Sequence, residues 1–163
     1  MKAAPLFSIL QIPISSIISR MKIYFSGSIS GGREHAAIYQ KLVAYLQTLG
    51  HDVLSAHVAD PDVLEREKDT APRLVFQRDV AWVHACDVMI AEVSTPSLGV
   101  GYEYGLAVQL DKPVLCVYRS GLRLSKMITG NPAPNLKVAT YSTETELERI
   151  TFSFLESLTT AHV

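Results

Sequence analysis

From about residue 21 onward, short apolar runs alternate along the chain with longer amphipathic stretches. Apolar runs bounded by Gly, Pro and charged residues are typical of buried strands. The stretches between them place apolar residues three and four positions apart, which indicates helices packed on a core. The expected strands are Ile23 to Phe25, Asp52 to Ala56, Asp87 to Val93, Pro113 to Tyr118 and Lys137 to Tyr141. The expected helices are Gly32 to Leu49, Pro72 to His84, Gly101 to Leu110 and Glu144 to Leu158, with a loop or short helix over 60–70 and another over 121–130.

This regular alternation of strand and helix predicts an α/β fold. We expect a doubly wound, flavodoxin- or Rossmann-like five-stranded parallel sheet with helices on both faces. In such sheets, ligands bind beyond the carboxyl ends of the strands, where the strand order switches. Two glycine-rich segments directly follow predicted strands, so both should lie at that edge.

The first informative segment is SLGVGYEYG at 97–105, which follows Pro96 and an apolar run. Its pattern predicts a strand, a turn and a helix with Glu103 in the first helical turn, where the helix dipole favours an ionised carboxylate. Glycines at 99, 101 and 105 would let a substrate approach closely. These features suit a nucleophile or a general base. The alternative is that Glu103 only complements the dipole from a solvated face.

The second segment runs from Gly27 to Arg33 and precedes a long helical pattern. Backbone N–H groups of such a loop form an anion site, to which Ser28 and Ser30 add hydroxyl groups and Arg33 adds a positive charge. The spacing matches neither a Walker A motif nor GxGxxG. The alternative is a tight strand-to-helix turn that binds no ligand.

Composition narrows the class of protein. A chain of 163 residues with 48% hydrophobic and 19% charged residues fits one globular domain. The net charge of −1 argues against a broad nucleic-acid surface. Cys86 and Cys116 lie in apolar surroundings without metal-ligand spacing, as expected for buried thiols in a reducing compartment. We therefore expect a cytoplasmic protein, also nuclear if the source is eukaryotic, with no metal and no membrane contact.

Residues 1–20 differ from the rest of the chain. They carry Lys2, Arg20 and four serines but no acidic residue, and Pro5 and Pro13 interrupt the apolar stretch. The prolines make this a poor membrane helix. We expect a dispensable N-terminal extension followed by one catalytic domain over 21–160, with a secretory or transit peptide as the alternative.

Five segments together carry a family resemblance: GSISGGRE at 27–34, HVAD at 57–60, Asp79 in QRDVAW, AEVSTPSLGVGYEYG at 91–105 and LSKMITG at 124–130. They resemble the 2′-deoxynucleoside 5′-phosphate N-hydrolases, which belong to the nucleoside 2-deoxyribosyltransferase superfamily. The match extends from about Met21 to about Leu158, which is nearly the whole chain.

The resemblance implies a role for several residues. Glu103 would be the catalytic nucleophile, with Asp79 beside it to position it and to handle the leaving base. Tyr24 would contact the sugar and the carboxylate, although core packing alone also explains it. His57 would lie near the base, although a lone His is more often structural. The residues expected to bind substrate are Gly27, Ser28, Ile29, Ser30, Gly31, Gly32, Arg33, Tyr39, His57, Ser97, Gly99, Ser125 and Met127, of which Tyr39 is expected mainly to face the core.

The expected reaction is hydrolysis of the N-glycosidic bond of (2′-deoxy)nucleoside 5′-monophosphates through a covalent glycosyl–Glu103 intermediate. Ser97 and Ser125 would contact the phosphate, with Ser125 supplied by the neighbouring subunit of a homodimer. Many family members carry Arg where this chain has Ser30, which puts the phosphate requirement in question. The alternatives are transfer of deoxyribose between bases, a non-catalytic nucleotide sensor and, more weakly, a flavodoxin-like electron carrier.

Overall fold

The computed structural model describes residues 19–160, which form a five-stranded parallel sheet in the order β2-β1-β3-β4-β5. This arrangement confirms the predicted α/β class. The strands are β1 (Lys22–Ser26), β2 (Asp52–Val53), β3 (Val88–Glu92), β4 (Val114–Arg119) and β5 (Leu136–Tyr141). The predicted N-terminal extension, residues 1–20, lies outside the described residues except for its last two positions.

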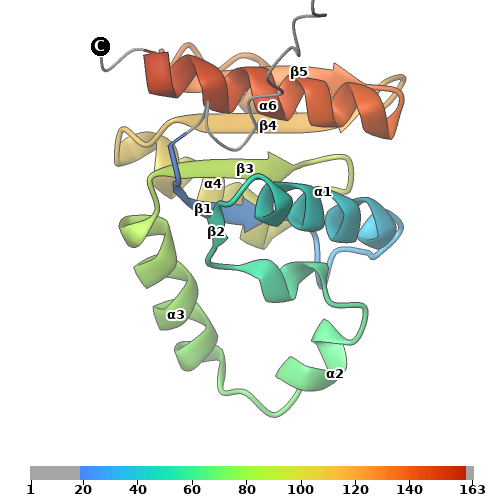
Figure 1. Cartoon of the computed structure of the whole chain (residues 1–163). Helices are drawn as coiled ribbons and strands as arrows, with labels where there is room; N and C mark the ends of the chain where they lie inside the picture. Colours follow the sequence, from blue (N-terminus) through green and yellow to red (C-terminus); the bar gives the residue numbers. More distant parts are fainter. Residues whose placement is uncertain (1–18, 161–163) are drawn as a thin grey trace, which may run out of the picture.

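Helices cover both faces of the sheet, and each face has its own hydrophobic core. The helical elements are α1 (Ala36–Thr48), η2 (Ala56–Ala59), α2 (Val63–Glu67), α3 (Pro72–Ala85), α4 (Leu98–Gln109), α5 (Lys126–Thr129) and α6 (Glu144–Thr160). Helices α1 and α6 pack on one face, whereas α3 and α4 pack on the other (Figure 1). Within residues 19–160, no helix is both long and apolar enough to cross a membrane.

Three element boundaries differ from the sequence prediction by three residues or more. Strand β2 has only two residues, because the Ser55 side chain bonds to both backbone groups of Phe25, at 2.8 Å to its N–H and 2.6 Å to its C=O, and the chain then turns into η2. His57 therefore lies in η2 and not at a strand end. Helix α1 begins at Ala36 instead of Gly32. Helix α4 begins at Leu98 instead of Gly101, because Ser97 caps it.

Helix α3 extends beyond the sheet. Its C-terminal part is anchored by the buried Val83, whereas Leu74 and Phe76 near its N-terminus are more than half exposed. Figure 1 shows α2 and the loop that joins it to α3 extending away from the strands. The space between α2 and the N-terminal part of α3 is consequently bounded by side chains that do not belong to the main core.

The two glycine segments meet where the strand order switches, between β1 and β3. Gly31 packs directly on the other segment: a Cβ added to it would lie only 2.5 Å from the carbonyl oxygen of Pro96. Gly32 has φ +139°, a conformation that side-chain-bearing residues rarely adopt. The prediction that both segments share the carboxyl edge of the sheet is thus confirmed, and glycine is needed there to bring the two backbones together.

Candidate active site

Glu103 lies at the centre of a cluster of polar side chains from β1, α3 and α4. Its Oε2 accepts a 2.5 Å hydrogen bond from the hydroxyl of Ser26, the last residue of β1. The Tyr24 hydroxyl and the Asp79 carboxylate are close enough to influence the ionisation of Glu103. Sequence analysis had placed Glu103, Asp79 and Tyr24 together as the catalytic group, and the structure brings the three side chains into one place.

Burial raises the pKa of Glu103 from its ordinary value of 4.5 to about 7. The negative charge of Asp79 raises the pKa further, whereas hydrogen bonds from Ser26 and Tyr24 and the charge of Arg78 oppose the rise. The prediction that Glu103 lies in the first helical turn is wrong: it is the sixth residue of α4, beyond the first turn in which the dipole would favour its ionised form. A partly buried carboxylate with a pKa near neutrality is suited to nucleophilic or acid–base chemistry at physiological pH.

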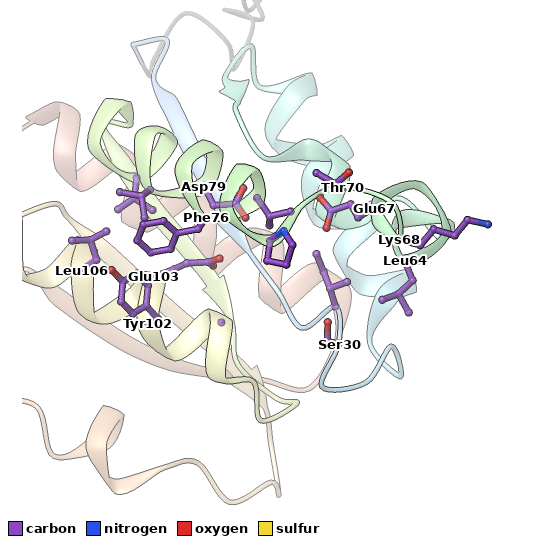
Figure 2. A pocket seen from close by; sticks show the side chains of 16 residues that line it. Ser30, Leu64, Glu67, Lys68, Thr70, Phe76, Asp79, Tyr102, Glu103 and Leu106 are labelled. Atoms are coloured by element: carbon purple, nitrogen blue, oxygen red, sulfur yellow. The ribbon is translucent and has the colours of Figure 1, made fainter.

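A cavity of about 550 Å³ opens on the α3 side of Glu103. Figure 2 shows that Asp79, Phe76, Glu103, Tyr102 and Leu106 line one part of it, from α3 and α4. The rings of Phe76 and Tyr102 are 5.9 Å apart, and both are about half exposed. Because flat aromatic rings bind well to other aromatic rings, this wall suits a planar heterocycle.

The opposite wall of this cavity is more polar. It is formed by Ser30 together with Leu64, Glu67, Lys68 and Thr70, all but Ser30 from α2 and the loop that follows it (Figure 2). The cavity is therefore bounded on one side by helices attached to the sheet and on the other by the short segment 60–71.

A second cavity of about 400 Å³ adjoins the first, and seven residues line both cavities: Ile29, Ser30, Glu67, Val75, Asp79, Gly99 and Glu103. The second cavity is formed by the two glycine segments at the N-terminus of α4, with further lining from Tyr24, Gly27, Gly31 and Ser97. Backbone N–H groups at the start of a twelve-residue helix are suited to an anion. The lining includes no Lys or Arg side chain among the described residues, so this cradle depends on backbone and hydroxyl donors.

Arg33 and Tyr39 support the first glycine segment from behind. The Arg33 guanidinium donates hydrogen bonds to the carbonyls of Ser28 (3.2 Å), Val58 (2.9 Å) and Asp60 (2.8 Å). The Tyr39 hydroxyl accepts a bond from the Ser28 N–H, and its ring lies against Gly27. Both residues thus hold the loop in shape, and the prediction that the Arg33 charge serves the anion site is not supported by these contacts.

His57 contacts Glu67 but lines neither of the two cavities around Glu103. Its Nε2 is 3.3 Å from the Glu67 carboxylate, and its ring lies 5.5 Å from that of Trp82, in a separate cavity of about 380 Å³. Burial and the positive charge of Arg78 lower the pKa of His57 below its ordinary value of 6.5. The described geometry therefore gives His57 an indirect connection to the site, through Glu67 and Arg78.

Ser125 and Met127 do not join the Glu103 site within their own chain. They line a groove of about 590 Å³ between α4 and α5, together with Gly101 and Gly105. These two glycines had been expected to give a substrate access to Glu103. They lie instead on the groove side of α4, and of the three α4 glycines only Gly99 lines the cavities around Glu103.

Several residues that shape the site are not among those predicted from the sequence: Ser26, Glu67, Phe76, Arg78 and Tyr102. Ser26 directly precedes Gly27, so its position at the end of β1 was a usable signal. The sequence gives no such signal for Glu67, because this residue lies in a charged stretch without apolar periodicity. Within residues 19–160, no group of three or more His, Cys, Asp or Glu side chains is arranged to hold a metal ion.

Known proteins that resemble this chain have names that refer to the glycosidic bond of nucleosides or nucleotides. Residues 23–145 match the family model described as nucleoside 2-deoxyribosyltransferase. A 5-hydroxymethyl-dUMP N-hydrolase of Danio rerio is 45% identical over 143 residues, which cover 85% of this chain and 99% of the relative. The enzyme of the same name from Mus musculus is 49% identical over 112 residues, covering 66% of this chain and 64% of the relative.

A solved structure of a Clostridium botulinum CMP N-glycosidase shares the fold, with a TM-score of 0.60 at 20% identity over 80% of this chain and 97% of that one. The resemblance first seen in the glycine segments thus extends across the sheet and both of its helical layers. On the strength of the family match and the full-length relatives, the chain belongs to the nucleoside 2-deoxyribosyltransferase family.

Proposed function

We propose that this protein hydrolyses the N-glycosidic bond of 2′-deoxynucleoside 5′-monophosphates, releasing the free base and deoxyribose 5-phosphate. The observation that carries the proposal is the position of Glu103. Its partly buried carboxylate, with a pKa of about 7, lies between a cavity with an aromatic wall and a backbone anion cradle. Relatives named 5-hydroxymethyl-dUMP N-hydrolases support the substrate class.

A nucleotide fits this arrangement in one orientation. The base would occupy the cavity beside Phe76 and Tyr102, and the 5′-phosphate would bind to the N–H groups of the glycine segments and the start of α4. The sugar would then lie over Glu103, the residue that the two cavities share near Tyr24. Each part of the substrate thereby meets groups of matching chemistry.

The reaction would proceed in two displacements, as in retaining glycosidases. Glu103 attacks C1′ as a carboxylate and forms an ester to the sugar while the C1′–N bond breaks, and the base leaves as an anion that is protonated through Asp79 in the second displacement. Water then attacks C1′, gives its proton to Asp79 and releases Glu103. Tyr24 and Ser26 hold the Glu103 carboxylate by hydrogen bonds so that it faces the sugar.

The decisive test is to incubate the purified protein with a panel of 2′-deoxynucleoside and ribonucleoside 5′-monophosphates and the matching nucleosides, and to measure the release of free base by chromatography. We expect base release from the 2′-deoxynucleoside 5′-monophosphates and a covalent sugar adduct on the Glu103 peptide after acid quenching. A new nucleoside formed when a second free base is added would favour the transferase alternative. Binding without base release would favour the sensor alternative.

We further propose that the protein acts as a homodimer in which Ser125 completes the site of the partner subunit. We also propose a cytoplasmic location, and a nuclear one in addition if the source is eukaryotic. The groove between α4 and α5 supports the homodimer, because Leu98 and Met127 beside it are 97% and 81% exposed. Large exposed apolar side chains of this kind are typical of protein interfaces.

Subunit mixing tests the shared site. Glu103→Ala and Ser125→Ala proteins are mixed after partial dissociation, and base release is measured. In a dimer with shared sites, one site of each mixed dimer carries both defects and the other is intact, so activity returns to a fraction of wild type. Self-contained sites would each retain one defect, and mixing would restore no activity.

A further inference from the structure

Arg78 joins two carboxylates on opposite walls of the site. Its Nε donates a 2.8 Å hydrogen bond to Oδ1 of Asp79, and its Nη2 lies 2.7 Å from Oε1 of Glu67. The first contact is within α3, whereas the second extends from α3 to the end of α2. In Figure 2, Glu67 and Asp79 lie on the two sides of the larger cavity. A single guanidinium therefore connects a catalytic carboxylate to the wall that faces it.

The connection is shielded from water. The Nη2 atom of Arg78, the Oε1 atom of Glu67 and the Nε2 atom of His57 are each buried, and none of them makes a hydrogen bond of good geometry with the described residues, so their contacts are close charge pairs. The Arg78 guanidinium also lies 5.1 Å from the centre of the Trp82 ring, which fixes its plane. An ion pair that water does not reach is screened little by salt, and removing one member leaves a buried charge without a partner.

Segment 60–71 has few other attachments. Helix α2 has five residues and buries only Val63, and its remaining ion pairs join neighbours along the chain, Arg66 to Asp60 and Lys68 to Glu65. The contacts of Glu67 with Arg78 and His57 thus link the end of α2 to α3 and η2. Losing them would release the wall that carries Leu64, Lys68 and Thr70.

We propose that Arg78 is a positioning residue for the hydrolase reaction: it orients the Asp79 carboxylate toward Glu103 and holds the end of α2, through Glu67, as the far wall of the base cavity. The expected effects on the reaction rate rest on the proposed function, whereas the attachment of α2 by Arg78 does not. Because Arg78 engages only Oδ1 of Asp79, Oδ2 stays available to the site. Arg78 itself acts through Asp79 and Glu67, without forming a bond to the reacting atoms.

The positive charge of Arg78 lowers the pKa of Glu103. The charged and titratable groups that act on Glu103 are Tyr24 from β1 and Asp79 and Arg78 from α3, and Arg78 is the one that lowers its pKa by charge. Around Arg78 itself are Asp79 on α3, Glu67 on α2 and His57 on η2. Neutralising Arg78 must therefore raise the pKa of Glu103 and move the acidic limb of the rate profile to higher pH.

The test compares three variants on α3. Arg78→Gln removes the charge, Arg78→Lys keeps the charge but loses the planar fork, and Arg73→Gln removes a charge from the exposed part of the same helix. We expect Arg78→Gln to lower kcat/KM about tenfold and to move the acidic limb of the pH profile upward. Arg78→Lys should keep the limb near its wild-type position while lowering kcat, and Arg73→Gln should match wild type throughout.

A second measurement does not depend on activity. Trypsin cleaves after Arg66 and Lys68 only when the α2 segment opens, so the folded Arg78→Gln protein should be cut there faster than wild type or Arg73→Gln. Unchanged kinetics and cleavage in Arg78→Gln, or equal changes in Arg73→Gln, would overturn the inference. If wild type releases no base, the proposed function fails, and the cleavage rates alone then decide whether Arg78 holds α2.

Discussion

The two sides of Glu103 are built in different ways. On the phosphate side, the cradle consists of backbone from two segments that follow adjacent strands, with Gly31 in contact with the carbonyl of Pro96. On the base side, the far wall is a short helix connected to the domain by side-chain ion pairs, above all Glu67 with Arg78. The first side is fixed by the sheet, and the second depends on charged groups that a single substitution can remove.

This difference suggests that the two sides of the site have different roles in substrate binding. A rigid cradle can hold the phosphate in one place and so fix the sugar over Glu103, whereas a wall held by side chains can adapt to the base. Substitutions at Glu103, Gly31 and Ser30 test this difference between the two sides.

Glu103→Gln removes the group that both sides serve. We expect base release to fall by roughly a thousandfold or more, because the amide cannot form the covalent ester. Nucleotide binding should persist, since the cradle and the aromatic wall are intact. Rapid turnover by a folded Glu103→Gln protein, measured by chromatography of the released base, would contradict the assignment of the nucleophile.

Gly31→Ala tests the rigid side. The added Cβ would lie 2.5 Å from the Pro96 carbonyl oxygen and 2.8 Å from the Ser28 hydroxyl, so the two segments must move apart. We expect kcat/KM for 5′-monophosphates to fall by roughly ten- to a hundredfold, as for a displaced oxyanion-type donor set. Nucleosides lack the phosphate and serve as the internal control, with a smaller loss. An equal loss on both substrates would place the phosphate elsewhere.

The same contrast determines what the sequence could predict. The cradle was predictable because a strand followed by a Gly-rich turn is a local signal, and parallel topology then places both turns at one edge. The details of the cradle were not predictable. Glu103 lies in the second turn of α4, because the Ser97 cap moves the start of the helix toward the N-terminus, from Gly101 to Leu98. Arg33 bonds to three carbonyls behind the loop, which no pattern in the sequence indicates.

The base side was largely unpredictable for a physical reason. Glu67 meets Arg78 and His57, partners ten or more positions away, and the segment between them has no apolar periodicity that fixes its path. Ion pairs of this kind depend on tertiary placement, so a charged stretch gives the same signal whether or not it lines a site. The aromatic pair Phe76 and Tyr102 escaped notice because its members lie on different helices.

Glu103→Gln also makes a prediction about stability. Burial raises the folded-state pKa of Glu103 from 4.5 to about 7, so its contribution to stability is present below about pH 4.5 and is lost as the pH rises through about 7. At pH 8 the buried carboxylate is ionised and destabilises the fold, which the neutral amide avoids. We expect the variant to be more stable than wild type at pH 8 by roughly 1–3 kcal/mol, with a smaller difference at pH 5.

Thermal unfolding at the two pH values measures this effect. Glu65→Gln is the matched control, because Glu65 is an exposed carboxylate on α2 and should show no such pH-dependent gain. A Glu103→Gln protein that is equally destabilised at both pH values would mean that Glu103 contributes packing or hydrogen bonds worth more than the cost of its ionisation.

Ser30→Arg would add a charge to the rigid side. Ser30 lies on the first glycine segment and lines both cavities, and the cradle around it has no Lys or Arg in its described lining. An arginine at this position could bond to the phosphate, and one charge-assisted hydrogen bond is worth about 1.5 kcal/mol, or roughly tenfold in affinity. We expect KM for 5′-monophosphates to fall by up to that factor, with a steeper dependence on salt and no change for nucleosides. Ser30→Gln adds a shorter, uncharged hydrogen-bonding side chain and is the control. If both variants bind nucleotides as wild type does, the phosphate does not approach this loop, and the cradle at the start of α4 must hold it alone.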